Sequence, residues 1–189
     1  MIELRLKQTQ VRLDFSFFAV ITLFLLLDDS GFGIAALCAC GLHELAHLSL
    51  MLLFGITADK ITFYGAGIRI SSDSTDRAKP FAKALILSAG CAANFIAAAV
   101  FRFLGNDAAA AINLFTGIFN LLPLGELDGA SLLKMLAIRV CRPENVDKVT
   151  KAAGMISVAL AAATAIFFVG EFPFTLITTA LYIFFISTL

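Results

Sequence analysis

Long apolar stretches separated by short polar breaks dominate the pattern of hydrophobic and polar positions along this chain of 189 residues. A helix needs about 20 mostly apolar residues to cross the hydrocarbon core of a bilayer. The apolar stretches and the breaks between them predict about six transmembrane helices, two of them shorter than this length. Their expected ranges are 15–27 (with 11 as an alternative start), 32–54, 80–104, 108–122, 152–169 and 172–189.

Two regions alternate apolar and polar residues, which is the period of a strand. Residues 2–6 and 11–15 fit either surface strands or a solvated tail. Residues 59–70 alternate on both sides of Gly65-Ala66-Gly67 and predict a β-hairpin. An exposed edge of that hairpin can hold an extended peptide as an added strand, and a purely structural hairpin is the alternative.

The remaining segments are polar or amphipathic. A polar linker spans 71–79, an amphipathic stretch on the membrane surface spans 130–141, and a charged segment runs on to 151. The predicted fold is an all-α polytopic membrane protein with about six transmembrane helices and a small membrane-associated β-hairpin. We expect residues 1–189 to form a single transmembrane domain.

The composition supports a membrane protein and argues against a nucleic-acid partner. Hydrophobic residues make up 60% of the chain and charged residues 15%, with a mean hydropathy of +0.93. The formal net charge is zero, and the chain has no basic cluster with interleaved aromatic residues. The expected surroundings are therefore the lipid bilayer.

The distribution of the basic residues predicts the orientation. With six crossings, all of the 14 Lys and Arg residues except Arg102 fall on the side that carries both termini and the hairpin. Because cytosolic loops carry an excess of Lys and Arg, we expect both termini on the cytosolic side.

The second apolar stretch contains the sequence His43-Glu44-Leu45-Ala46-His47, with the only two histidines of the chain. Residues four apart lie on one face of a helix, so both imidazoles can bind one zinc ion. Glu44 would lie beside the metal, where it can take a proton from a bound water. The alternative is a pair of core histidines with a buried glutamate partner, but ionisable groups at membrane depth usually mark a functional site.

A catalytic zinc usually has three protein ligands and a water, and the chain has no third histidine. The third ligand is therefore a carboxylate or Cys40, which lies three residues before His43 and shares its helix face. Asp128 follows a helix broken by Pro123, on irregular backbone of the kind that membranes tolerate next to a watery cavity. A helix N-cap is the other role open to Asp128, and Glu126 is the fallback ligand.

These motifs resemble those of the site-2 protease family of intramembrane zinc metalloproteases. That family has a His-Glu-x-x-His helix and a later Asn-x-x-Pro followed by Leu-Asp-Gly, which this chain matches at 43–47, 120–123 and 127–129. Gly90 and Asn94 match the family's Gly-x-x-x-Asn element. The resemblance covers about residues 31–130, the expected catalytic core.

The resemblance implies a role for each matching residue. It implies that zinc is bound by His43, His47 and Asp128 and that Glu44 is the catalytic base. Asn94 and Asn120 look like substrate or transition-state contacts, although an interhelical hydrogen bond explains either amide equally well.

The implied activity is hydrolysis of a peptide bond within or near the transmembrane helix of a membrane-anchored protein. The layout is similar to the bacterial branch that processes a membrane-bound sporulation sigma factor. This branch implies a bacterial cell membrane and a single-pass substrate such as a membrane-bound transcription regulator. The active-site opening is expected on the cytosolic side, because the histidines lie in the half of the second helix nearer the side that the basic residues mark as cytosolic.

Two other functions remain open. Prenyl-protein endopeptidases also use His-Glu-x-x-His but take a later glutamate as third ligand, here Glu126 or Glu144. A zinc-handling protein, or an inactive homologue that acts as a membrane chaperone, would not need Glu44.

Overall fold

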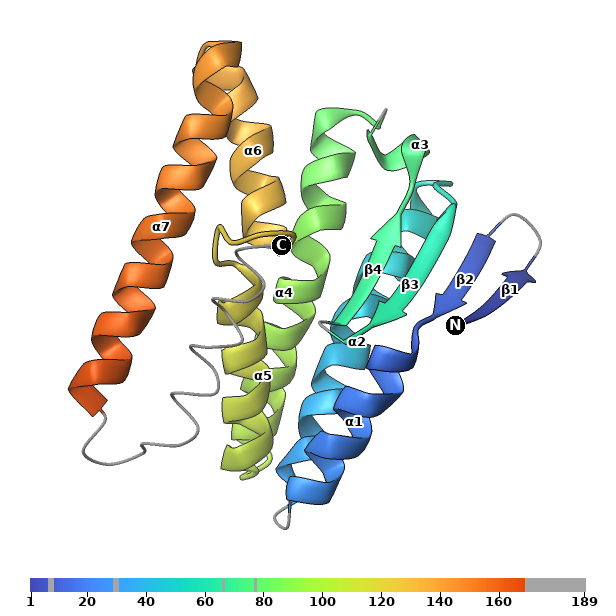
Figure 1. Ribbon diagram of the computed structural model, residues 1–189, viewed down its shortest axis with the longest axis vertical. Coiled ribbons are helices and arrows are strands. Elements are labelled where there is room, and N and C mark those ends of the chain that lie inside the picture. The colour runs from blue at the N-terminus through green and yellow to red at the C-terminus, as the bar shows by residue number, and fades with distance from the viewer. Residues whose placement is uncertain (7–8, 29–30, 66, 77, 169–189) are drawn as a thin grey trace. The chain divides into compact units, whose positions relative to one another are not determined.

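The structure is a computed structural model that describes residues 1–6, 9–28, 31–65, 67–76 and 78–168. The chain divides into two compact units, Met1–Ile118 and Phe119–Leu189. The elements of the first unit, in chain order, are β1 (Ile2–Leu6), β2 (Thr9–Leu13), α1 (Phe15–Leu27), α2 (Phe32–Leu53), β3 (Lys60–Tyr64), β4 (Gly67–Ser71), α3 (Asp73–Asp76), α4 (Pro80–Phe103) and most of α5 (Asp107–Asn120) (Figure 1). The second unit holds the end of α5, α6 (Asp128–Val140) and α7 (Pro143–Phe168).

The four strands form one sheet in the order β1-β2-β3-β4 (Figure 1). β1 and β2 are antiparallel, as are β3 and β4, whereas β2 runs parallel to β3 with Val11 opposite Ile61. The predicted hairpin at 59–70 is confirmed. The amino-terminal residues are strands and not a solvated tail, and β2 begins two residues earlier than predicted.

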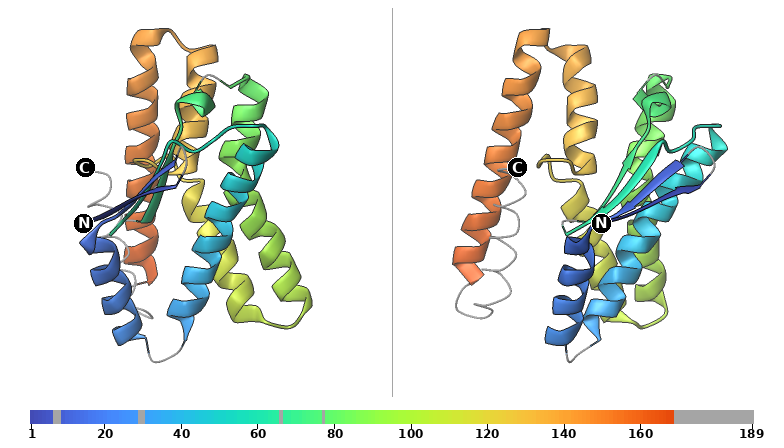
Figure 2. Two further views of the ribbon diagram at one scale, coloured as in Figure 1. Left: turned by 90° about the vertical axis from the view of Figure 1, so that its right-hand side faces the viewer. Right: turned by 45° about the vertical axis from the view of Figure 1, so that its right-hand side comes forward.

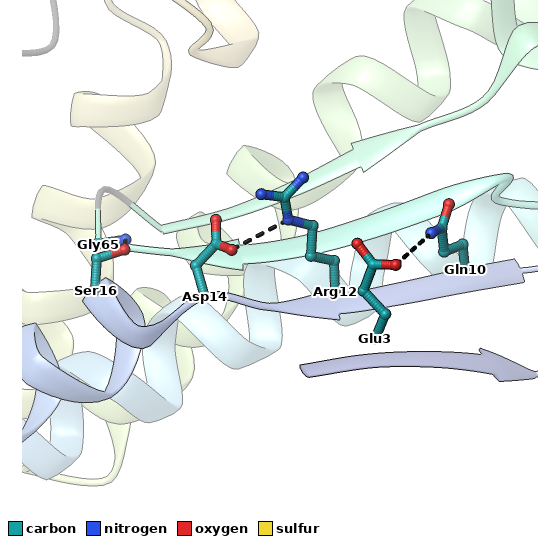
Figure 3. Close-up of polar contacts among 6 residues, drawn as sticks. All are labelled: Glu3, Gln10, Arg12, Asp14, Ser16 and Gly65. Atoms are coloured by element: carbon teal, nitrogen blue, oxygen red, sulfur yellow. Dashed lines mark hydrogen bonds and ion pairs between the residues drawn. The ribbon is translucent and has the colours of Figure 1, made fainter. Parts of the chain in front are cut away.

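Polar contacts connect the sheet to the first turn of α1 (Figure 3). The Arg12 guanidinium donates from Nε to Asp14 Oδ1 at 3.1 Å, just before α1 begins. The backbone N–H of Gly65, in the turn between β3 and β4, donates to Ser16 Oγ at 3.1 Å. α1 begins at Phe15, and the alternative start at 11 is wrong, because residues 9–13 form β2.

α2 packs along α4, as the ribbons in Figures 1 and 2 show. The buried residues of α2 include Ala39, His43, His47 and Met51, which are four apart and therefore share one face. The facing side of α4 is built mainly from small residues, which let the two backbones approach closely. Its buried residues are Ile86, Ala89, Gly90, Cys91, Asn94 and Ala98.

A small hydrophobic cluster lies where α2, α4 and the sheet meet. Met51, Ile56, Ala58 and Ile86 are its buried members. Apolar residues of the strands, including Ile61 and Ile70, pack against it. The cluster therefore anchors the sheet beside the end of α2 that follows the histidines.

Two helices in the part of the chain that the structure describes are long and apolar enough to cross a membrane. They are α2, with 22 residues and a hydropathy of 1.5, and α4, with 24 residues and a hydropathy of 2.0. Of their most apolar windows, 22% and 33% are buried, so most residues of these windows are not buried. α1 and α5, with 13 and 14 residues, are shorter than a full span.

Several predictions about helices need correction. The polar linker contains the short helix α3. The charged segment before 151 is helical, because α7 begins at Pro143 and not at 152, with proline in the first turn where its missing N–H costs nothing. The predicted last helix at 172–189 lies outside the described residues. The fold is therefore mostly helical with a four-stranded sheet, and not all-α with a single hairpin.

In the second unit, α6 and α7 pack against each other as a helical hairpin (Figure 1). The amphipathic stretch predicted at 130–141 is α6, which begins slightly earlier, at Asp128. A Cβ on Gly129 would overlap the backbone carbonyl group of Leu121. The first turn of α6 thus lies directly on the chain that leaves α5, and only glycine fits there.

Candidate metal centre

The two histidines are buried between α2 and α4. The exposed fractions are 3% for His43 and 8% for His47. The two rings meet edge to face, with centroids 4.8 Å apart. Because both rings are buried and shielded from bulk water, each ring nitrogen needs a partner, either a group of the protein or a bound ligand.

The partners of the two Nδ1 atoms fix the tautomers of both rings. His47 Nδ1 lies 2.7 Å from the carbonyl oxygen of Ile86, which can only accept a hydrogen bond, so His47 Nδ1 carries the proton. His43 Nδ1 lies 2.7 Å from Asn94 Oδ1. Asn94 Nδ2 donates to the Ala39 carbonyl oxygen at 3.0 Å, which orients the amide with its oxygen toward His43.

With Nδ1 protonated on both rings, each Nε2 presents a lone pair, and these two atoms are 3.1 Å apart. Two lone pairs this close repel each other unless a cation lies beside them. Two nitrogen ligands about 2.05 Å from a tetrahedral zinc would be about 3.4 Å apart. The observed separation is therefore close to the one that zinc requires.

Gly90 leaves space in front of these two atoms. A Cβ at Gly90 would lie 2.5 Å from Nε2 of His43 and 2.5 Å from Nε2 of His47. A position near both nitrogens is thus open only because residue 90 has no side chain. The donor set and this space together fit a zinc ion.

The other residues predicted in the first unit differ in their placement. Glu44 follows His43 directly and is half-buried. Cys40 is exposed, although it lies on the same helix, whereas Cys91 of α4 is buried. The Cys91 sulfur lies within 4.8 Å of a ring nitrogen of His43. Cys91, and not Cys40, is thus the cysteine at the buried side of the site.

Asn94 is fully buried, with an exposed fraction of 0%, and its amide contacts His43, the Ala39 carbonyl oxygen and Asn113. Among the residues described, it joins α2 to α4 as the interhelical alternative expects. Its predicted contact with the substrate stays a prediction.

Asn120, Glu126 and Asp128 belong to the second unit. Asn120 is the last residue of α5, Glu126 is exposed in the turn that follows, and Asp128 is the first residue of α6. The predicted third-ligand role of Asp128 and the predicted contact of Asn120 with the substrate stay predictions.

One buried polar residue was missed in the sequence. Asn113 of α5 has an exposed fraction of 4%, and its Oδ1 accepts from Asn94 Nδ2 at 3.1 Å. An amide in the middle of an otherwise apolar helix was the signal that could have found it, because such groups need a buried partner.

Comparison with known proteins gives two findings. Residues 106–164 match the family model of Peptidase family M50. The structure is similar to the site-2 protease from Methanocaldococcus jannaschii, with a TM-score of 0.69 and 21% sequence identity, over 99% of this chain and 93% of the other. The fold is that of a site-2 protease. A search of curated protein sequences gave no match.

The two findings involve different parts of the chain. The family match contains Asn120, Pro123 and Asp128 but neither histidine, and it covers less than a third of the chain. The similarity to a site-2 protease fold extends over nearly the whole chain. The His43–His47 site is therefore an observation separate from the family match.

Proposed function

We propose that this protein is an intramembrane zinc metalloprotease of the site-2 protease type, within Peptidase family M50. The observation that carries the proposal is the pair of Nε2 atoms of His43 and His47, 3.1 Å apart beside the space at Gly90. The match of residues 106–164 to a peptidase family supports it from a separate part of the chain.

The proposed zinc ligands are His43, His47 and Asp128. When bound, zinc would act as a Lewis acid that polarises a peptide carbonyl and lowers the pKa of a bound water towards about 7. Glu44, next to His43, takes a proton from the attacking water and passes it to the leaving amine. The Ile86 carbonyl and Asn94 hold the two imidazoles in the orientation that metal binding needs.

The proposed substrate is a single-pass membrane protein, for example a membrane-bound transcription regulator. The backbone carbonyls of a transmembrane helix are occupied by hydrogen bonds, so the substrate has to unwind locally before attack. The outer edge of β4 can hold the unwound segment of the substrate as an added strand, because in the described sheet β4 pairs only with β3. We expect cleavage near the cytosolic end of the substrate helix, in the membrane of a bacterial cell.

The first test compares wild-type protein with Glu44→Gln, each reconstituted with a reporter single-pass protein whose helix carries weakening residues. We expect both to hold one zinc and only the wild type to cut, with a loss of about 10²- to 10⁴-fold in the variant. Glu3→Gln, which changes an exposed glutamate on β1, is the matched control and should cut normally.

Further variants separate the proposal from its rivals. We expect Asp128→Asn to lose zinc. If Asp128→Asn keeps its zinc and either Glu126→Gln or Glu144→Gln loses it, the ligand set is that of a prenyl-protein endopeptidase. Zinc in both wild type and Glu44→Gln without cleavage of any reporter would favour a zinc-handling protein or membrane chaperone. Absence of zinc from the wild type after metal loading would refute the proposal.

A further inference from the structure

Asn113 is the end of a chain of hydrogen bonds that leads to His43. Its Nδ2 donates to the Ala109 carbonyl oxygen at 2.9 Å, and its Oδ1 accepts from Asn94 Nδ2 at 3.1 Å. Asn94 Oδ1 in turn faces His43 Nδ1 at 2.7 Å. The chain therefore crosses from α5 through α4 to α2, entirely within the first unit.

Each step of this chain has only one possible direction. The Ala109 carbonyl can only accept, so the Asn113 amide must place its nitrogen there and its oxygen toward Asn94. Asn94 then directs its nitrogen to two acceptors, Asn113 Oδ1 and the Ala39 carbonyl. Its oxygen is left for His43, which must donate from Nδ1.

We propose that Asn113 is a positioning residue that, through Asn94, holds His43 in the tautomer with the proton on Nδ1 and the lone pair of Nε2 directed to the metal. The role rests on the proposed zinc chemistry, but the tautomer itself exists without metal. A flipped Asn94 would present its NH₂ group to His43 Nδ1 and favour the proton on Nε2, which then cannot bind zinc.

The loss of the Asn113 acceptor would weaken this preference in two ways. One N–H of Asn94 would stay buried without its partner, which destabilises the present amide orientation. Only the Ala39 carbonyl would then oppose the flip. Loss of partners behind metal-binding histidines typically lowers metal affinity by about 10- to 100-fold.

The test uses ¹⁵N-histidine labelling, because His43 and His47 are the only histidines and give two ring systems. Asn113→Leu removes the acceptor at similar size. Asn113→Asp keeps it, since a carboxyl oxygen accepts from Asn94 in either protonation state. Thr116→Val, which removes a hydroxyl from the same helix, is the control.

In metal-free protein we expect His43 to carry its proton on Nδ1 in wild type, Asn113→Asp and Thr116→Val. In Asn113→Leu we expect a substantial fraction of the protein to carry the His43 proton on Nε2, and we expect a zinc affinity about 10- to 100-fold lower than that of the wild type. If Asn113→Leu does not fold, Asn113→Ala replaces it, and we expect the same result from that variant.

The proposal fails if the acceptor-free variants keep both the Nδ1 tautomer and the zinc affinity. It also fails if Asn113→Asp and Asn113→Leu lose zinc equally with the tautomer unchanged, because that pattern indicates a packing role only. A wild type that shows the expected tautomer but binds no zinc would refute the proposed protease and leave the positioning chain intact.

Discussion

The missing side chain at Gly90 is what leaves room in front of His43 and His47. We predict that Gly90→Ala lowers zinc affinity by at least about 10-fold, because its Cβ would lie 2.5 Å from both Nε2 atoms. Gly41→Ala on α2 is the matched control, since a Cβ there meets nothing within 4 Å. Zinc affinity is measured by competition with a chelator.

Alanine is the better helix former by about 1 kcal/mol, so neither substitution should weaken its helix. A loss of zinc in Gly41→Ala as large as in Gly90→Ala would contradict the prediction, because it would indicate a general effect of glycine replacement.

At the residue scale, the sequence predicted what lies within a short motif and missed what depends on packing. His43, Glu44 and His47 are recognisable because one helical turn brings them together. Asn113 belongs to no motif, and its partner Asn94 is 19 residues away on another helix. Only the packing of α5 against α4 brings the two amides together, and no local pattern encodes that.

At the scale of elements, the sheet shows the same limit. Alternation predicted the strands at 59–70, and it left 2–6 and 11–15 open, because period two fits both a strand and an exposed tail. The parallel pairing of β2 with β3 was missed, since it joins segments about 50 residues apart that are separated by α1 and α2. Helix length was misjudged where charged residues continue a helix, as in α7.

The outer edge of β4 allows a direct test of substrate addition. We predict that a photoreactive residue at Ser71, which is exposed on β4, cross-links to the reporter substrate in Glu44→Gln protein. A photoreactive residue at Ala108, exposed at the start of α5, should not cross-link. Equal cross-linking from both positions, or none from Ser71, would count against strand addition at this edge.

The start of α6 depends on one glycine. We predict that Gly129→Ala abolishes reporter cleavage, because its Cβ would overlap the backbone carbonyl group of Leu121 and force the first turn of α6, with Asp128, to move. Lys134→Ala, an exposed change on the same helix, should leave cleavage intact. Cleavage rates are compared at equal amounts of folded protein, and normal cleavage by Gly129→Ala would overturn this prediction.

For the whole molecule, zinc should act as a stabilising ligand. A ligand that binds only the folded protein stabilises it by about 4 kcal/mol at a free concentration about 1,000-fold above its Kd. We therefore expect zinc to raise the unfolding temperature of the detergent-solubilised wild type and a chelator to lower it. His43→Ala/His47→Ala should show neither response, and an equal response in that variant would place the zinc elsewhere.

The orientation in the membrane is testable within the first unit alone. α4 has 24 residues and is about 36 Å long, enough to cross about 30 Å of hydrocarbon. The sheet precedes α4, and the turn to α5 follows it (Figure 1). A residue on β4 and a residue at the start of α5 should therefore lie on opposite sides of the bilayer.

With the six crossings predicted from the sequence, all of the 14 Lys and Arg residues except Arg102 are expected on the side of the termini and the sheet, which predicts that this side is cytosolic. In a background without the four cysteines, we expect an impermeant maleimide to label Ala108→Cys on intact cells and Ser71→Cys only after the membrane is opened. The reverse pattern would show that the protein has the opposite orientation in the membrane, with β4 and any strand added to it outside the cytosol. Labelling of both positions on intact cells would show that α4 does not cross the membrane.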